Sequence, residues 1–175
     1  MKNLVIFFDS GDTIVDESTE VRDDRGIVVR AQLHDEGGAL LRQLHEDGFT
    51  LALVADGEVE SFKNIYEQHG LSDVFSARAI SEALPDRKPA AVMFQTAMDQ
   101  LHLTDADKKR VVMIGNNLIR DVVGANRFGI TSILYDWSPR YDMNPKNQEE
   151  TPDYTVHTRQ ELYALLQKLD KECTA

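Results

Sequence analysis

The sequence predicts an α/β fold, in which a three-layer, doubly wound sheet is built from about five parallel strands. Short runs rich in Val, Ile, Leu and Phe recur along the chain and stop at polar or small residues, as buried parallel strands do. Stretches with apolar residues at helical spacing separate these runs, so strands and helices alternate. The 175 residues, 42% of them hydrophobic, suffice for one core, and we expect a single domain over residues 1–175.

The first strand is expected at residues 4–8, where an apolar run leads directly into Asp9. Residues 14–30 place a polar Asp-Asp-Arg-Gly turn between two β-prone pieces, which predicts a small hairpin that we call the flap.

The remaining elements continue the alternation. The other strands of the sheet are expected at residues 49–55, 74–80, 110–115 and 131–135. Apolar residues at helical spacing predict helices over residues 33–48, 59–70, 89–101 and 118–128. The first of these helices includes Leu33, Pro89 stands at the start of the third, and Gly129 caps the fourth. Residues 136–152, rich in Pro, Asn and charge, predict a long loop, and residues 153–172 a short edge strand and a final amphipathic helix.

Charge and cysteine content exclude several classes of partner. The net charge of −11 argues against nucleic acid and anionic membranes, because binding phosphate groups over a surface needs a basic field. Cys173 is the only cysteine, so no disulfide framework is expected. The sequence contains no recognisable signal peptide or membrane-spanning run, and a cytoplasmic location is the simplest expectation.

The turn after the first strand carries the most informative motif. An aspartate that ends a buried parallel strand delivers its carboxylate to the edge of the sheet where active sites of such folds lie. Here the residues are Asp9, Ser10, Gly11, Asp12 and Thr13. This turn resembles the first motif of the haloacid dehalogenase superfamily, usually Asp-x-Asp-Gly-Thr, with the second Asp and the Gly exchanged.

Three further motifs of that superfamily follow in the expected order. Residues 51–57 occupy the place of the second motif, with Ala55 where a Thr or Ser normally ends the strand. Lys88, before Pro89, matches the third motif. In the fourth, usually Gly-Asp followed after four residues by Asp, Asn116 replaces the first acid and Asp121 keeps the second. The ordered set makes the resemblance specific, although the first, second and fourth motifs are degenerate.

The resemblance implies catalytic roles for Asp9, Asp12 and Lys88. Asp9 matches a nucleophile that forms an aspartyl-phosphate, and Lys88 would neutralise it, unless Lys88 is an ordinary surface lysine. The family's general acid and base lies two residues after the nucleophile, where this chain has Gly11. Asp12 is either a displaced replacement or a turn-forming residue, because side chains three apart on an extended segment do not share a face. Loss of acid–base help costs about 10²–10⁴ in rate.

The resemblance also implies the groups that contact phosphate. The residues expected to bind it are Ser10, Gly11, Thr13, Ala55, Asp56, Gly57 and Lys88. At Ala55 the missing hydroxyl removes a hydrogen bond to a charged group worth roughly 1.5–3 kcal/mol. The backbone amides of Asp56 and Gly57, at the start of a helix, can still bind an anion. Arg87 is either a second cation or a solvated surface charge.

A magnesium ion is the cofactor that the resemblance implies. Asp9, Gly11, Asn116 and Asp121 are its expected ligands. Mg²⁺ keeps several waters and is held by one or two carboxylates, so binding is expected, but weaker than with three acids. The alternative is that Asn116 and its neighbour only shape a turn while Asp121 caps a helix.

We therefore expect a magnesium-dependent phosphatase that acts on a phosphorylated substrate, small or macromolecular. The superfamily often inserts a cap domain after its first or second motif. In this sequence the flap, core helices and one strand fill those intervals, so we expect no large cap and an open site. An open site also suits a homo-oligomer in which a neighbouring subunit closes the cleft. Trp137, Arg140 and Tyr141 lie at the same edge of the sheet, and we favour a packed Trp with two surface residues over contacts to substrate. The alternative function is that of a catalytically impaired relative that binds a partner through its cleft or acidic surface.

Overall fold

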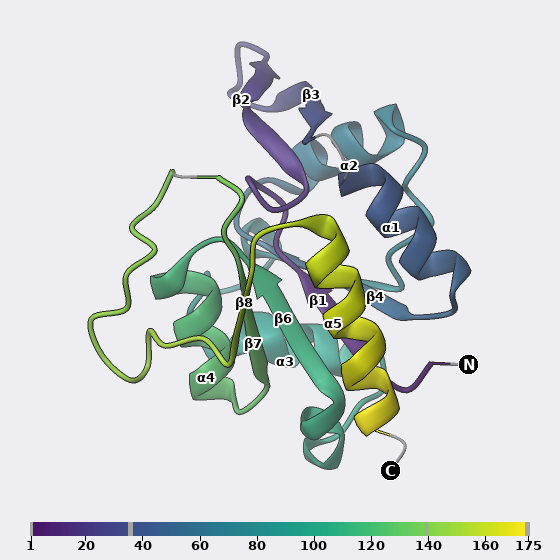
Figure 1. Ribbon diagram of the computed structural model, residues 1–175. Coiled ribbons are helices and arrows are strands. Elements are labelled where there is room, and N and C mark those ends of the chain that lie inside the picture. The colour runs from purple at the N-terminus through teal and green to yellow at the C-terminus, as the bar shows by residue number, and fades with distance from the viewer. Residues whose placement is uncertain (1, 35–36, 139, 174–175) are drawn as a thin grey trace.

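The computed structural model describes residues 2–34, 37–138 and 140–173. Within this part of the chain, the main sheet has six parallel strands in the order β5-β4-β1-β6-β7-β8 (Figure 1). The strands are β1 (Val5–Phe8), β4 (Thr50–Ala55), β5 (Ala77–Ile80), β6 (Val111–Gly115), β7 (Thr131–Tyr135) and β8 (Tyr154–Val156). The parallel α/β sheet predicted from the sequence is confirmed, with β8 as the edge strand. No helix in the described ranges is both long and apolar enough to cross a bilayer.

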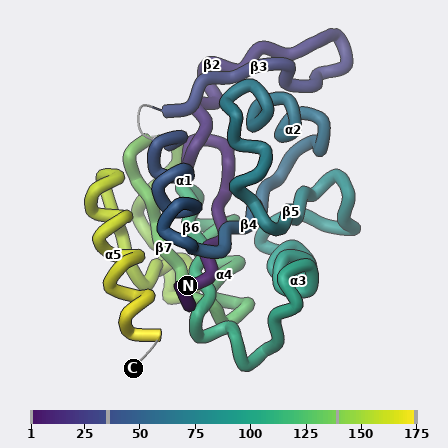
Figure 2. The backbone as a smooth tube through the Cα atoms, turned by 90° about the vertical axis from the view of Figure 1, so that its right-hand side faces the viewer, coloured from purple at the N-terminus to yellow at the C-terminus, as the bar shows by residue number. Residues whose placement is uncertain are grey.

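Helices cover both faces of this sheet, as Figure 2 shows for α1 and α5 on one side and α3 on the other. The helices are α1 (Gly37–Glu46), α2 (Val59–Gln68), α3 (Ala91–Gln100), α4 (Val123–Phe128) and α5 (Arg159–Glu172). A π-helical turn, Leu118–Val122, leads into α4, and short 3-10 helices lie at Ser81–Ala83 and Asp105–Arg110.

The strand β1 shows why an apolar run makes the centre of such a sheet. Ile6 and Phe8 pack with α1 and α5, whereas Val5 and Phe7 pack with α3 and α4. All four side chains are at most 2% exposed. Successive side chains of a strand point to opposite faces, so a strand with helices on both sides must be apolar at every position.

The predicted flap is a two-stranded antiparallel hairpin of β2 (Val15–Arg22) and β3 (Val28–Leu33), at the top of Figure 1. It packs on α2, where Val28 and Ala31 contact Ile65. The Val28 N–H donates to Ser61 Oγ at 2.9 Å, and the Gln68 side-chain amide pairs with both backbone groups of Ala31 at 3.2 and 3.0 Å. The hairpin is therefore joined to the helix through its own backbone.

The predicted start of the first helix was wrong. Leu33 ends β3, where it pairs with Val15, and α1 begins at Gly37. The side chain of Leu33 packs against the same core as the α1 residues do, which explains why its spacing matched theirs. Residues 35–36 of the expected helix lie outside the described residues.

The helix α5 is joined to the start of β1 by one buried carboxylate. Asp170 Oδ1 accepts hydrogen bonds from the backbone N–H groups of Asn3 at 2.7 Å and Leu4 at 3.0 Å. Its Oδ2 lies 3.2 Å from Lys2 Nζ. Although burial raises the pKa of Asp170, these donors together hold it below its usual value.

We predict that Asp170→Asn lowers the free energy of unfolding by about 1–2 kcal/mol at pH 7, because hydrogen bonds to a charged group are lost. The pKa of Asp170 is lower in the folded protein than its ordinary value of 3.8. The ionised carboxylate therefore stabilises the fold at pH values above 3.8, and this stabilisation is lost as the pH falls through the folded-state pKa. Urea unfolding of both proteins at pH 7 and pH 3 checks this. A difference that persists unchanged at pH 3 would contradict the assignment to the carboxylate charge.

Candidate active site

The candidate site lies at the carboxyl ends of three neighbouring strands. Asp9 follows β1, Asp56 follows β4 and Asn116 follows β6. The Asp9 N–H donates to the carbonyl of Ile114 at 2.9 Å, which extends the pairing of β1 with β6 by one residue. Since these strands are parallel and adjacent, their polar ends meet at one edge, as the sequence predicted.

A buried ammonium group holds this edge together. Lys88 Nζ lies 2.6 Å from Asp9 Oδ1 and 2.7 Å from Asp121 Oδ1. Lys88 is 3% exposed and Asp121 is 1% exposed, which excludes the alternative of a solvated surface lysine. The Lys88 backbone N–H also donates to Asp56 Oδ1 at 3.0 Å. One residue therefore connects the ends of β1 and β4 with the turn after β6.

The charges in this cluster shift one another's protonation. Burial lowers the pKa of Lys88, but the negative charges of Asp121 and Asp9 outweigh it and hold the pKa above its usual value. Burial and the Asp9 charge raise the pKa of Asp121 to about 6, against the opposing effect of Lys88. At neutral pH the Lys88 ammonium thus lies beside an Asp121 carboxylate that is largely ionised.

The turn after β6 is shaped to bring Asp121 close to the strand. A Cβ atom on Gly115 would overlap Asp121 Oδ2, so a side chain there would push the carboxylate away. The Asn117 N–H donates to that Oδ2 at 3.1 Å, and the Asn117 side chain caps the π-helical turn by accepting from the Arg120 N–H at 3.1 Å. Turn formation by Asn117, one of the alternatives from the sequence, is therefore present.

Asp12 lies at the base of the flap. Its backbone has a positive φ of 49°, and its side chain is 1% exposed. Oδ1 accepts the Glu17 N–H at 3.1 Å, Oδ2 forms an ion pair with Arg140 Nε, and the carbonyl accepts the Trp137 indole N–H at 2.7 Å. The carboxylate is thus engaged with the hairpin and the loop after β7, and its acid–base role remains a prediction.

The loop after β7 contributes two of the partners just described, and the sequence did not predict the ion pair that one of them makes. Trp137 packs on the His34 ring, with centroids 4.3 Å apart, as expected for a packed Trp. Arg140 forms an ion pair with the buried Asp12, but its own side chain is 39% exposed, so it lies at the surface as expected. Tyr141 accepts a hydrogen bond of 2.8 Å from Arg120 Nη2. Arg120 was also missed, although its position within the fourth motif could have indicated that it lies at this edge.

The residues expected to bind phosphate surround Asp9, and several already have partners. Ser10 Oγ and Tyr66 Oη share a hydrogen bond of 2.8 Å, and Thr13 Oγ1 donates to Asp9 Oδ2 at 3.3 Å. The Gly57 N–H donates to Ser81 Oγ at 3.0 Å. Ala55, at the end of β4, is 1% exposed. The binding of phosphate by these residues stays a prediction.

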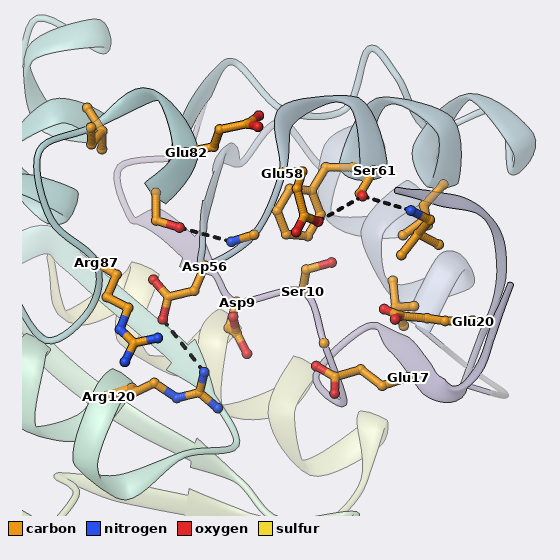
Figure 3. Close-up of a pocket in the computed structure, with 18 of the residues that line it drawn as sticks. Asp9, Ser10, Glu17, Glu20, Asp56, Glu58, Ser61, Glu82, Arg87 and Arg120 are labelled. Atoms are coloured by element: carbon orange, nitrogen blue, oxygen red, sulfur yellow. Dashed lines mark hydrogen bonds and ion pairs between the residues drawn. The ribbon is translucent and has the colours of Figure 1, made fainter. Parts of the chain in front are cut away.

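Asp56 lies beside a second cation of the site, Arg120. Its Oδ2 is buried and makes no hydrogen bond within the described part of the chain, but it lies 3.7 Å from Arg120 Nη1. Figure 3 shows Arg120 and Arg87 on one side of Asp9 and Asp56. The negative charge of Asp56 thus faces a guanidinium group, which offsets the repulsion that this carboxylate would exert on a phosphate.

A cavity of about 770 Å³ opens over Asp9, within the size range of sites for small molecules. The flap, the start of α2 and the segment that precedes Lys88 form its walls (Figure 3). The walls carry charges of both signs: Glu17, Glu20 and Arg22 from the flap, Asp56 and Glu58, then Glu82, Asp86, Arg87 and Arg120. Such a lining suits a polar ligand that carries charge.

Glu17 is the wall residue that lies beside the nucleophile motif. It belongs to β2, and its side chain is 35% exposed. Burial and the nearby charge of Asp12 raise the pKa of Glu17, with Arg140 opposing them. Sequence reasoning placed this residue only in a polar hairpin, because nothing in its local spacing shows where the carboxylate points.

The expected magnesium ligands fit an ion only in part. In the described ranges, no group of three or more His, Cys, Asp or Glu side chains is arranged to hold a metal ion. Both Asp121 oxygens accept hydrogen bonds, from Lys88 and Asn117. Asn116 is 1% exposed, and its Nδ2 has no partner in the described part of the chain. A half-turn of the amide would put its oxygen there, and an amide oxygen is a ligand that a hard cation accepts.

Comparison with known proteins identifies the family. The chain matches the family of haloacid dehalogenase-like hydrolases over residues 30–135 and belongs to it. It is 29% identical over 133 residues to the glyceraldehyde 3-phosphate phosphatase of Methanopyrus kandleri, covering 75% of this chain and 55% of the relative. The ribulose-1,5-bisphosphate 5-phosphatase of Halopiger xanaduensis is 29% identical over 130 residues, covering 72% and 53%. The chain spans about half the length of these relatives.

Solved structures agree on the fold. The hydrolase YfnB from Bacillus subtilis, crystallised with magnesium, superposes with a TM-score of 0.74 at 17% identity, covering 95% of this chain and 99% of that one. A phosphatase of the superfamily from Thermococcus onnurineus gives a TM-score of 0.72 at 18% identity, covering 93% and 97%. The superfamily resemblance and the fold class predicted from the sequence are therefore confirmed.

We predict that Lys88→Met lowers the free energy of unfolding by about 3–5 kcal/mol, because it leaves buried carboxylates without a counter-charge. The double variant Lys88→Met/Asp121→Asn should recover part of the loss, since one of those carboxylates is gone. Urea unfolding at pH 7 measures both, with Lys63→Met as the control. Lys63 is 67% exposed and 3.9 Å from Glu67, so its loss should cost less than about 0.5 kcal/mol. A Lys88→Met protein as stable as the control contradicts the role given to this cluster.

Proposed function

We propose that this protein is a phosphohydrolase that transfers a phosphoryl group from an ester to Asp9 and then to water. The observation that carries the proposal is the Asp9 carboxylate, held by Lys88 at 2.6 Å and lining a polar cavity. Its side chain is 14% exposed, so it is accessible from that cavity while most of it is packed. The relatives named above are phosphatases, which supports the same class of reaction.

In the first step an Asp9 carboxylate oxygen forms a bond to phosphorus while the bond from phosphorus to the ester oxygen breaks. In the second step water attacks the same phosphorus, the bond to Asp9 breaks, and phosphate leaves. Lys88 orients the Asp9 side chain for attack, because its ammonium group is fixed between Asp9 and Asp121. Arg120 and Arg87 supply positive charge at the cavity wall, where a phosphate oxygen would lie.

Magnesium would be held by Asp9 and Asn116, with the Gly11 carbonyl and Asp121 as the further ligands expected from the sequence. A bound ion would supply positive charge that offsets the negative charge of the transferring phosphoryl group. With one carboxylate and one amide side chain best placed to bind it, we expect affinity in a range that requires millimolar Mg²⁺.

We propose a small organic phosphate as the substrate. The cavity volume of about 770 Å³ accommodates a molecule of that kind, and the mixed charges of its wall can bind both a phosphate and polar hydroxyl or carboxyl groups. The relatives act on glyceraldehyde 3-phosphate and ribulose-1,5-bisphosphate according to their names, which are molecules of this size and chemistry.

We predict that the purified protein, with millimolar Mg²⁺, hydrolyses p-nitrophenyl phosphate and that Asp9→Asn abolishes this activity, because an amide cannot act as the nucleophile. Release of p-nitrophenolate measures it. Asp24→Asn is the matched control, since Asp24 is exposed at the tip of the flap, and it should retain full activity. If no ester in a broad panel is hydrolysed, the proposal is wrong and the binding-protein alternative takes its place.

The metal part of the proposal has its own test. Treatment with a chelator should reduce hydrolysis to background, and titration with Mg²⁺ should restore it with a midpoint in the millimolar range. Asn116→Asp should shift that midpoint to lower concentration, because it adds a carboxylate at the proposed site. Activity that is insensitive to the chelator contradicts a role for a divalent ion.

A further inference from the structure

The structure leaves space for a side chain at position 11, and another residue fills it. Gly11 follows Asp9 by two residues, the spacing at which side chains of an extended segment share a face. A Cβ atom built on Gly11 would overlap Glu17 Oε1 and lie 2.7 Å from its carboxyl carbon. The Glu17 carboxylate therefore occupies the position that the Cβ atom of any other residue at position 11 would take, on the side of this segment that carries the Asp9 side chain.

Glu17 reaches this place from the flap, and neighbouring groups hold it there. Its backbone N–H donates to Asp12 Oδ1 at 3.1 Å, which fixes the start of β2 against the nucleophile turn. Its Oε2 lies 3.7 Å from Arg140 Nη1, close enough for attraction and longer than a hydrogen bond. Figure 3 shows Glu17 beside the same cavity as Asp9. The carboxyl group is thus positioned, yet open to a ligand.

Other acids near the nucleophile are engaged elsewhere. Asp12 is 1% exposed and binds the Glu17 amide and the Arg140 guanidinium. Glu20, the other acid that the flap contributes to the cavity wall, is hydrogen bonded to Arg22. Of these three acids, Glu17 is the one that lines the cavity with a carboxylate that is not hydrogen bonded to a side chain in the described part of the structure.

We propose that Glu17 is the proton-transfer group of the Asp9 reaction, an inference that rests on the proposed phosphohydrolase function. As the bond between phosphorus and the ester oxygen breaks, the Glu17 carboxyl gives its proton to that oxygen, which leaves as an alcohol. The Glu17 carboxylate then takes a proton from the water that attacks the aspartyl-phosphate. Asp9 is released as a carboxylate, phosphate leaves, and Glu17 is protonated again, so one turnover restores both residues.

The test compares two esters that need this proton to different degrees. The dinitrophenolate of 2,4-dinitrophenyl phosphate leaves without protonation, whereas the phenolate of phenyl phosphate leaves far more readily when protonated. In a single turnover, Glu17→Gln should slow release of phenol by about 10²–10⁴ and release of dinitrophenolate by less than about tenfold. With dinitrophenyl phosphate the variant should also accumulate aspartyl-phosphate, because attack by water lacks its base.

Moving the carboxylate from position 17 to position 11 distinguishes a role in proton transfer from a role in folding. Glu17→Ala empties the space beside Gly11, and adding Gly11→Asp puts a carboxylate there from the other chain segment. The double variant should release phenol at least tenfold faster than Glu17→Ala alone. Asp24→Asn, a carboxylate-to-amide change in the same hairpin, should match the wild type with both esters. Circular dichroism and urea unfolding establish that the variants are folded.

Two results overturn the inference in different ways. If the wild type hydrolyses both esters and Glu17→Gln slows them equally, or slows neither, Glu17 does not transfer the proton. Failure of Gly11→Asp to rescue a folded Glu17→Ala protein leads to the same conclusion. If the wild type hydrolyses no ester, the proposed function is wrong, and so is the role of Glu17 that rests on it.

Discussion

The ion cluster of Lys88 with Asp9 and Asp121 is the interaction on which the arrangement of the site depends. Its three members come from three segments far apart in sequence: the end of β1, the turn before α3 and the turn after β6. Taking charges out of water is costly, and the cost is repaid here by short contacts from one ammonium to two carboxylates. Any change that moves one member leaves the others buried without compensation, so the cluster fixes the segments relative to one another.

How much of the fold and of the site could be predicted from the sequence depends on how far apart in the sequence the interacting residues lie. The strands and Asp9 were predictable, because a buried parallel strand is a continuous apolar run and its end is marked by the first polar residue. Lys88 and Asp121 were predictable only through the ordered motifs. The ion pair of Arg140 with Asp12 and the position of the Glu17 carboxylate were not, since each side chain reaches the site from a loop or hairpin whose path is set by tertiary packing. Leu33 was misassigned for the converse reason, because a strand residue that joins the same core mimics helical spacing.

The exchange of Gly and Asp in the nucleophile turn has a coherent structural outcome. Position 11 carries no side chain and admits the Glu17 carboxylate, and position 12 carries a carboxylate that holds the Glu17 amide and Arg140. Both positions that differ from the usual motif thus contact Glu17 of the β2–β3 hairpin. The departure from the usual motif is therefore a rearrangement that involves β2 and the loop after β7, and its meaning could not be judged from the five residues of the turn alone.

The attachment of the flap to α2 determines how a ligand can reach Asp9. Val28 and Ala31 of β3 use their backbone groups to bond with Ser61, Asn64 and Gln68 of the helix. Swinging the hairpin aside would break these bonds one after another and expose the apolar contact beneath them. The hairpin is thus a wall whose position is tied to that of α2, so a ligand would enter the cavity beside the hairpin and not by displacing it.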